Sequence, residues 1–163
     1  MTHIAIGVAL GLVISSTALG HDGRQLQAEL RGDNEVPPVE TETRGRFHIH
    51  EREDGASAEY TLRVSDGERV TQAHFHCAPA GANGPIVVFL AGFHEPGWDV
   101  DGRWISNATL TDANVIDPRC GATLAEVLEQ ARIGNVYVNV HSVAHPAGVI
   151  RGQLLPERRR SRR

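Results

Sequence analysis

The chain has 163 residues, which is long enough for one domain with a buried core. All 16 basic residues are arginines and five of them stand in the terminal "RRRSRR", so the rest of the chain sets 11 arginines against 20 acidic residues. A body this acidic argues against nucleic-acid binding, and residues 156–163, whose arginines have no aromatic residues between them, are expected to form a disordered basic tail.

The first 20 residues predict a signal peptide. An apolar run from Ile4 to Ile14 leads to small polar residues and then to Ala18-Leu19-Gly20, the pattern of a cleavage site, so we expect the mature chain to begin at His21. The run is shorter than the roughly 20 apolar residues that cross a membrane, and no later run is suitable, so no transmembrane span is expected. The predicted location is exported: periplasmic, secreted or at the cell surface.

Residues 21–155 alternate between short apolar-polar segments and turns rich in Gly, Pro, Asn and Asp. The pattern predicts one all-β domain, an antiparallel sandwich or barrel, with about eight strands. The "SDG" near residue 66 is expected to be a turn, and residues 92–118 a long loop around one short strand. The expected strands are 25–31, 45–51, 57–64, 70–77, 86–91, 104–110, 136–141 and 148–155.

One helix is expected, over residues 123–133. Thr123 and Glu126 are spaced as a capping box, and Gly134 supplies the stop. An apolar stripe at helical spacing indicates that the helix packs against one end of the sandwich as a structural element; it consists of Leu124, Val127, Leu128 and Ala131.

The stretch "QAHFHC" contains a His-x-His motif. Alternation along a strand puts His74 and His76 on one face and Phe75 and Cys77 on the other, so the imidazoles point away from the core. In "NVYVNVHS" the polar face holds Tyr137, Asn139 and His141, and in the last strand it holds Arg151 and Gln153. If the three strands are neighbours, their same-face residues lie about 5 Å apart and the histidines meet beside Arg151.

Three imidazoles that meet in this way suit Zn(II) or Cu(II). His145, in the turn after His141, could supply a fourth nitrogen. The alternative stays open that these are ordinary histidines on a polar sheet face. A second His-x-His, His48 and His50 in "GRFHIHE", has no third ligand placed with it and is expected to lie on an exposed strand face.

Cys77 and Cys120 are an even pair in a chain predicted to be exported, where disulfides persist. A disulfide between them would stabilise the fold by about 4 kcal/mol on the chain-entropy account. The alternative is that Cys77 is a thiolate ligand beside His76. Its inward direction on the strand favours the disulfide.

Three segments, "LRGDNEVPPVET", "AHFHCAPAGANGPIVVFL" and "GNVYVNVHSVAHPAGVIRGQL", resemble the chordin-type (CHRD) domain, in the right order and from about Leu26 to Leu155. The resemblance implies an antiparallel Greek-key-like β-sandwich of the immunoglobulin or Cu/Zn superoxide dismutase type, and export in a single-domain microbial type, but little chemistry. The chain departs from the pattern at Ser142, where Thr is usual, and at Val149, where Glu is usual. Glu35, Asn139 and Arg151 are candidates to orient the ligands. The matching positions are Asn34, Glu35, Val36, Pro37, Pro38, His74, His76, Gly81, Gly84, Pro85, Asn139, His141, Gly148, Arg151, Gly152 and Gln153.

The sequence therefore favours an exported CHRD-domain protein that binds copper or zinc and is not an enzyme. One alternative is a metal-free extracellular protein-interaction module. Another is a dismutase-like copper redox enzyme, because His74, His76 and His141 follow the order of the copper ligands in Cu/Zn superoxide dismutases. Their dense zinc loop is not evident here, and fold likeness alone carries no activity.

Overall fold

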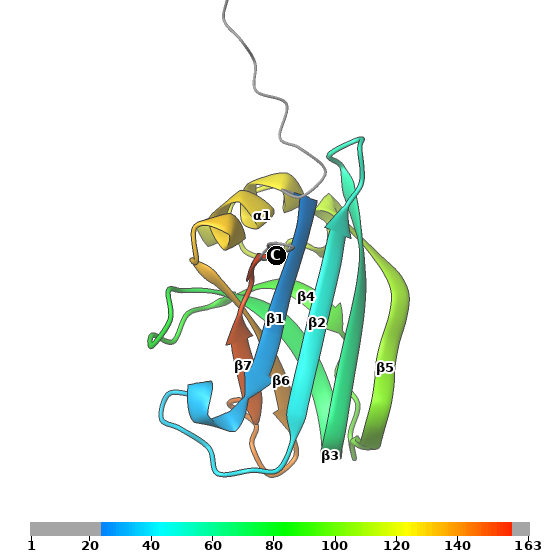
Figure 1. Ribbon diagram of the computed structural model, residues 1–163, viewed down its shortest axis with the longest axis vertical. Helices are drawn as coiled ribbons and strands as arrows, with labels where there is room; N and C mark the ends of the chain where they lie inside the picture. The colour runs from blue at the N-terminus through cyan, green and yellow to red at the C-terminus, as the bar shows by residue number, and fades with distance from the viewer. Residues whose placement is uncertain (1–23, 158–163) are drawn as a thin grey trace, which may run out of the picture.

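The computed structural model describes residues 24–157, so the predicted signal peptide and most of the predicted tail lie outside it. All pairings between its strands are antiparallel, which confirms the predicted all-β antiparallel class (Figure 1). The strands are β1 (Gln25–Arg31), β2 (Arg44–Glu51), β3 (Ser57–Cys77), β4 (Ile86–Ala91), β5 (Trp98–Thr111), β6 (Val136–Ser142), β7 (Ile150–Gln153) and β8 (Leu155–Pro156).

The pairing order makes a closed barrel. Neighbours run β2-β1-β7-β6-β3, and an additional pairing of β2 with β3 closes the ring, while β4, β5 and β8 attach at its sides. Only one residue pair joins β1 to β7, Arg31 with Arg151. A Cβ at Gly152 would stand 2.1 Å from the carbonyl oxygen of Glu29, so glycine is what allows β7 to approach β1 this closely. Of the two architectures that the strand pattern left open, the structure has the barrel, and it differs from the two separate packed sheets that the resemblance implies.

Strand β3 differs most from the prediction. The expected strands 57–64 and 70–77 are one strand of 21 residues, and the "SDG" near residue 66 bends the chain without reversing it. Asp66 and Arg69 have positive φ angles of 52° and 47°, and the register with β5 shifts on both sides of Gly67. The first part of β3 pairs with β2 and β5 and the second part with β6 and β4, so this strand belongs to both sides of the barrel.

Two other predicted boundaries are corrected. The expected long loop 92–118 contains β5, a strand of 14 residues that extends the predicted strand 104–110 at both ends. The expected strand 148–155 is divided into β7 and the two-residue β8, which pairs with β1 instead of β6. Short 3-10 turns connect the strands at Gly32–Asn34, Asp112–Asn114 and Pro118–Cys120.

Helix α1 (Leu124–Arg132) is confirmed together with its capping box. The Thr123 side chain accepts from the backbone N–H of Glu126, and the Glu126 side chain accepts from that of Thr123. The four residues of the apolar stripe are buried, and the helix lies across one end of the barrel (Figure 1). The segment between β1 and β2 and the turn between β6 and β7 lie at the other end.

Candidate metal site

The strands that carry the candidate ligands are neighbours, as the metal hypothesis requires. β6 lies between β3 and β7, with His74 opposite Asn139 and Asn139 opposite Arg151. His141 lies opposite Gln72, which is two residues before His74 on β3 and therefore on the same face. The valines of β6 and Phe75 belong to the hydrophobic core, so the three histidines project from the opposite face, as expected.

This face is covered instead of exposed. His74 is 0 %, His76 8 % and His141 4 % exposed. Three loop segments lie over the face and bond to it: 33–36 through Glu35, 80–85 through Gly84, and 143–149 through Pro146. The alternative of ordinary histidines on a solvent-exposed sheet face is therefore excluded. A buried polar group needs a partner, and each ring nitrogen has to be accounted for.

The ring nitrogens converge. Nδ1 of His74 lies 3.1 Å from Nε2 of His141, and one nitrogen from each of the three rings lies within 4.8 Å of the others. Three atoms with these separations share a point no more than about 2.8 Å from each, whereas a zinc–imidazole bond is about 2.0–2.1 Å long. Shifts of under about 1 Å would bring all three to bonding distance. Within residues 24–157, this is the one group of this kind.

Two backbone carbonyls fix which nitrogen faces the centre. Nδ1 of His76 lies 2.9 Å from the carbonyl oxygen of Gly84, and Nδ1 of His141 lies 3.0 Å from that of Pro146. A carbonyl oxygen only accepts, so each Nδ1 carries the hydrogen and each Nε2 keeps its lone pair. A Cβ at position 84 would stand 2.0 Å from the carbonyl oxygen of Cys77, so only glycine fits this turn.

Unpartnered ring nitrogens at this site fit the binding of a cation. Nε2 of His76 and Nε2 of His74 are both buried without a hydrogen-bond partner in the described chain. His74 can present either nitrogen, because its Nδ1 contacts His141 while its Nε2 has no partner. A bound cation would supply what these lone pairs lack.

The three imidazoles are neutral near neutral pH. Burial lowers the pKa of His74 to about 3 and that of His141 to about 4, and it also lowers the pKa of His76. Positive charge on one ring disfavours it on the next, which lowers the pKa of His74 and His141 further. Metal ions bind the neutral ring, so no proton must be removed at neutral pH.

The fourth predicted ligand, His145, and the alternative thiolate ligand, Cys77, lie elsewhere. His145 is half-buried in the turn after β6 and does not belong to the converging group, although its backbone N–H bonds the Ser142 hydroxyl. Cys77 faces the core and forms a disulfide with Cys120, with 5.7 Å between their Cα atoms. The predicted disulfide is confirmed, and Cys77 is not available as a thiolate.

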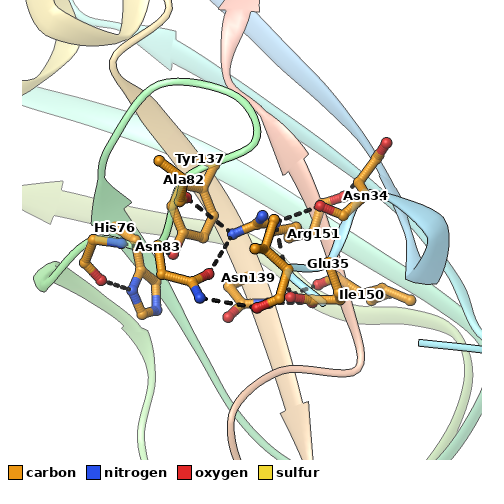
Figure 2. Close-up of polar contacts among 11 residues, drawn as sticks. Asn34, Glu35, His76, Ala82, Asn83, Tyr137, Asn139, Ile150 and Arg151 are labelled. Atoms are coloured by element: carbon orange, nitrogen blue, oxygen red, sulfur yellow. Dashed lines mark hydrogen bonds and ion pairs between the residues drawn. The ribbon is translucent and has the colours of Figure 1, made fainter. Parts of the chain in front are cut away.

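Beside the histidines, a polar network is centred on Arg151 (Figure 2). The guanidinium donates to the backbone carbonyls of Asn34 and Ala82 and to the side chain of Asn83. It also lies 4.7 Å from the ring centre of Tyr137, whose ring stacks on His76 at 4.9 Å. Arg151 therefore ties two loops to β7, and Tyr137 separates it from His76.

Glu35 and Asn139 complete this network. The amide of Asn139 donates to the Glu35 carboxylate at 2.7 Å and to the carbonyl of Ile150 at 3.0 Å. The Glu35 carboxylate lies 3.8 Å from Nε of Arg151. The sequence suggested Glu35 as a partner for a histidine or for Arg151, and the structure shows Arg151. Glu35 and Asn139 hold segment 33–36 over the face and do not contact the candidate ligand nitrogens directly.

Glu35 predicts a pH dependence of stability. Burial raises its pKa from 4.5 to about 7, against the opposing effects of Asn139 and Arg151. Since the folded chain holds this proton more tightly than the unfolded chain, the contribution is complete below pH 4.5 and is lost as the pH rises to 7. Relative to Glu35→Gln, the free energy of unfolding of the wild type should fall by about 3 kcal/mol over this interval and then level off.

Urea unfolding of the two proteins at intervals of half a pH unit measures this difference. The histidines titrate in both proteins, so subtracting one curve from the other isolates Glu35. A difference that is flat from pH 4 to 8 would contradict the raised pKa.

Sequence reasoning did not find the Gly84 and Pro146 carbonyls or the role of Tyr137. Backbone acceptors have no side-chain signal, so no motif could indicate them. Alternation placed Tyr137 on the same face as Asn139 and His141, but nothing in the sequence indicated that its ring would lie between Arg151 and His76.

Comparison with known proteins identifies one family. The CHRD domain matches residues 26–154, which is most of the chain and includes every residue of the site. Searches of curated proteins and of solved structures give no significant match. No helix within residues 24–157 is long and apolar enough to cross a membrane.

Proposed function

We propose that this chain, which belongs to the CHRD domain family, is an exported protein that binds one copper or zinc ion through His74, His76 and His141. The observation that carries the proposal is the convergence of three buried imidazoles whose ring nitrogens lie within 4.8 Å of one another. Two of these rings have their hydrogens turned outward onto backbone carbonyls. The site fits binding, storage or delivery of the ion, because the converging group consists of three imidazoles and contains no other reactive side chain within residues 24–157.

The donor set limits the choice of metal. Three imidazole nitrogens suit zinc and copper, whereas calcium and magnesium require oxygen ligands. His145 remains the candidate for a fourth nitrogen if the turn 143–149 closes toward the ion. Bound metal would join β3 to β6 and, through the two carbonyl bonds, would stiffen the loops 80–85 and 143–149.

A titration of the purified chain with Zn(II) and Cu(II) tests the proposal. We expect one ion per chain, and a higher melting temperature because only the folded state binds, worth about 2.7 kcal/mol at a free metal concentration 100 times Kd. His74→Ala/His76→Ala should weaken binding about 100-fold or more, because one imidazole remains. Stoichiometric binding that survives this change would refute the site.

The chain supplies a matched control. His48 and His50 on β2 have the same spacing as His74 and His76, but His48 is exposed and neither belongs to the converging group. His48→Ala/His50→Ala should leave stoichiometry and affinity unchanged. Any equal loss in both variants would indicate non-specific binding by surface histidines.

A metal-free interaction module is the second candidate, favoured by one observation. The bond between His74 and His141 and the network of Arg151 hold the site together with no ion. In this case partner binding is insensitive to chelators and added copper leaves the melting temperature unchanged.

The dismutase-like alternative has less support. It requires an open coordination position and a cation that guides the substrate to the ion. Arg151, the candidate for this cation, is 4 % exposed and lies behind Tyr137, with its Nε and Nη1 bonded to two loops. A superoxide assay that finds activity above that of free copper would nevertheless favour it.

Export is supported by the disulfide, since cysteine pairs persist as disulfides in oxidising compartments.

A further inference from the structure

We propose that the triad of His74, His76 and His141 selects copper in its monovalent state, Cu(I), over Cu(II) and Zn(II). This inference rests on the proposed function and names the ion that the same site prefers. Three properties of the site point to it: the charge of its ligands, the charge of its surroundings and the number of donors.

The ligands carry no negative charge. All three are neutral imidazoles, and no carboxylate belongs to the converging group within residues 24–157. The contacts of Glu35, the carboxylate of the neighbouring network, are to Asn139 and Arg151. The cost of moving an ion out of water rises with the square of its charge, so a divalent ion loses about four times as much hydration as a monovalent ion of equal size. Neutral ligands at a site this buried offset the cost for Cu(I) more fully.

The nearest cation acts in the same direction. The guanidinium of Arg151 lies 4.7 Å from the centre of the Tyr137 ring, and this ring stacks on His76, so a fixed positive charge stands behind a candidate ligand. Glu35, whose carboxyl lies 3.8 Å from Nε of Arg151, offsets this charge only when it is ionised. Repulsion from Arg151 is twice as large for a divalent ion as for a monovalent one.

The site offers few donors. Cu(II) prefers a tetragonal arrangement and Zn(II) a tetrahedral one, both with four or more ligands, whereas the filled d shell of Cu(I) tolerates three. The ring of Phe89 lies edge-on 4.4 Å from His74, and the ring of Tyr137 covers His76. Apolar rings around buried ligands keep water from completing the coordination shell of the ion. Apolar surroundings of this kind also raise the reduction potential of a bound redox metal.

Competition experiments test the inference. Cu(I) affinity is measured without oxygen against bicinchoninate, and Cu(II) and Zn(II) affinities are measured against chelators of known strength. We expect Cu(I) to bind about 100-fold more tightly than Cu(II), which places the Cu(II)/Cu(I) potential about 120 mV above that of the aqueous couple, since tenfold corresponds to 59 mV for one electron.

A charge-change variant with a matched control sharpens the test. Phe89 is half-exposed and pairs with His74. Phe89→Glu therefore places a carboxylate beside that ligand. Phe89→Gln is the matched control, because it changes shape and polarity without adding charge. Phe89→Glu should reduce the preference for Cu(I) at least tenfold, and Phe89→Gln should reduce it less than threefold. Equal effects of the two variants would overturn the charge argument.

The outcomes separate this inference from the function on which it rests. If Cu(II) or Zn(II) binds the wild type as tightly as Cu(I), the selection of Cu(I) is wrong and the metal site stands. If no metal binds in stoichiometric amount, the proposed function itself is wrong.

Discussion

Replacement of both Cys77 and Cys120 by alanine should lower the free energy of unfolding by about 4 kcal/mol. The disulfide joins residues 43 positions apart, and on the chain-entropy account such a cross-link removes much of the conformational freedom of the unfolded chain. Cys77 ends β3 directly after His76, and Cys120 ends the 3-10 turn before α1. The bond therefore also fixes the end of the strand that carries two of the three ligands.

Urea unfolding of the oxidised wild type and the double variant measures the difference. Wild type treated with a reductant is the control, because it loses the bond without losing either side chain. Reduced wild type and the variant should agree within about 1 kcal/mol, the remainder being the buried volume lost at Cys120. A total loss of under 1 kcal/mol would show that the unfolded chain is already compact in this region.

Much of the fold was predictable because the strands of this chain have one face in the core. Ala58, Tyr60, Leu62 and Val64 alternate with more exposed residues, and all four are buried in the structure. The capping box of α1 is likewise a local signal and predicted the helix to within one residue. The strand pattern left sandwich and barrel open and could not decide between them, because closure depends on pairings between strands far apart in the sequence, β1 with β7 and β3 with β6.

Residue 66 shows why a turn signal can mislead. Asp followed by Gly usually reverses a chain, and here Asp66 does take the left-handed conformation that such turns need. The flanking residues remain paired with β5, so the strand bends around the barrel and continues. Local conformation was predicted correctly, and tertiary pairing decided the outcome.

The candidate ligands were found by alternation and strand adjacency, but their burial was not predicted. His74 and His76 were assigned to the face opposite the core, and this assignment holds. The loops that cover them are held by backbone carbonyls and by Arg151, which bonds to residues 68 and 117 positions away. Contacts this distant leave no periodic pattern in a single sequence.

Replacement of Arg151 by methionine should cost about 3–5 kcal/mol at pH 8, the range found when one partner of a buried ion pair is removed. The change leaves the Glu35 carboxylate, which is 7 % exposed, without its compensating charge, and leaves the carbonyls of Asn34 and Ala82 without their donor. The loops 33–36 and 80–85 then lose their common anchor on β7. Arg151→Lys keeps the charge but not the fork of donors, so it should lose less.

A double variant separates the charge from the hydrogen bonds. Arg151 lowers the pKa of Glu35, so without Arg151 this carboxyl should take up a proton at a still higher pH. Glu35→Gln/Arg151→Met removes the uncompensated charge and should recover about 1–3 kcal/mol of the loss at pH 8, and almost none at pH 5, where Glu35 is already protonated. Urea unfolding of the four proteins at both pH values gives the coupling energy. The same coupling at both pH values would mean that Arg151 stabilises the chain through its hydrogen bonds and its packing on Tyr137, and that the ion pair contributes nothing measurable.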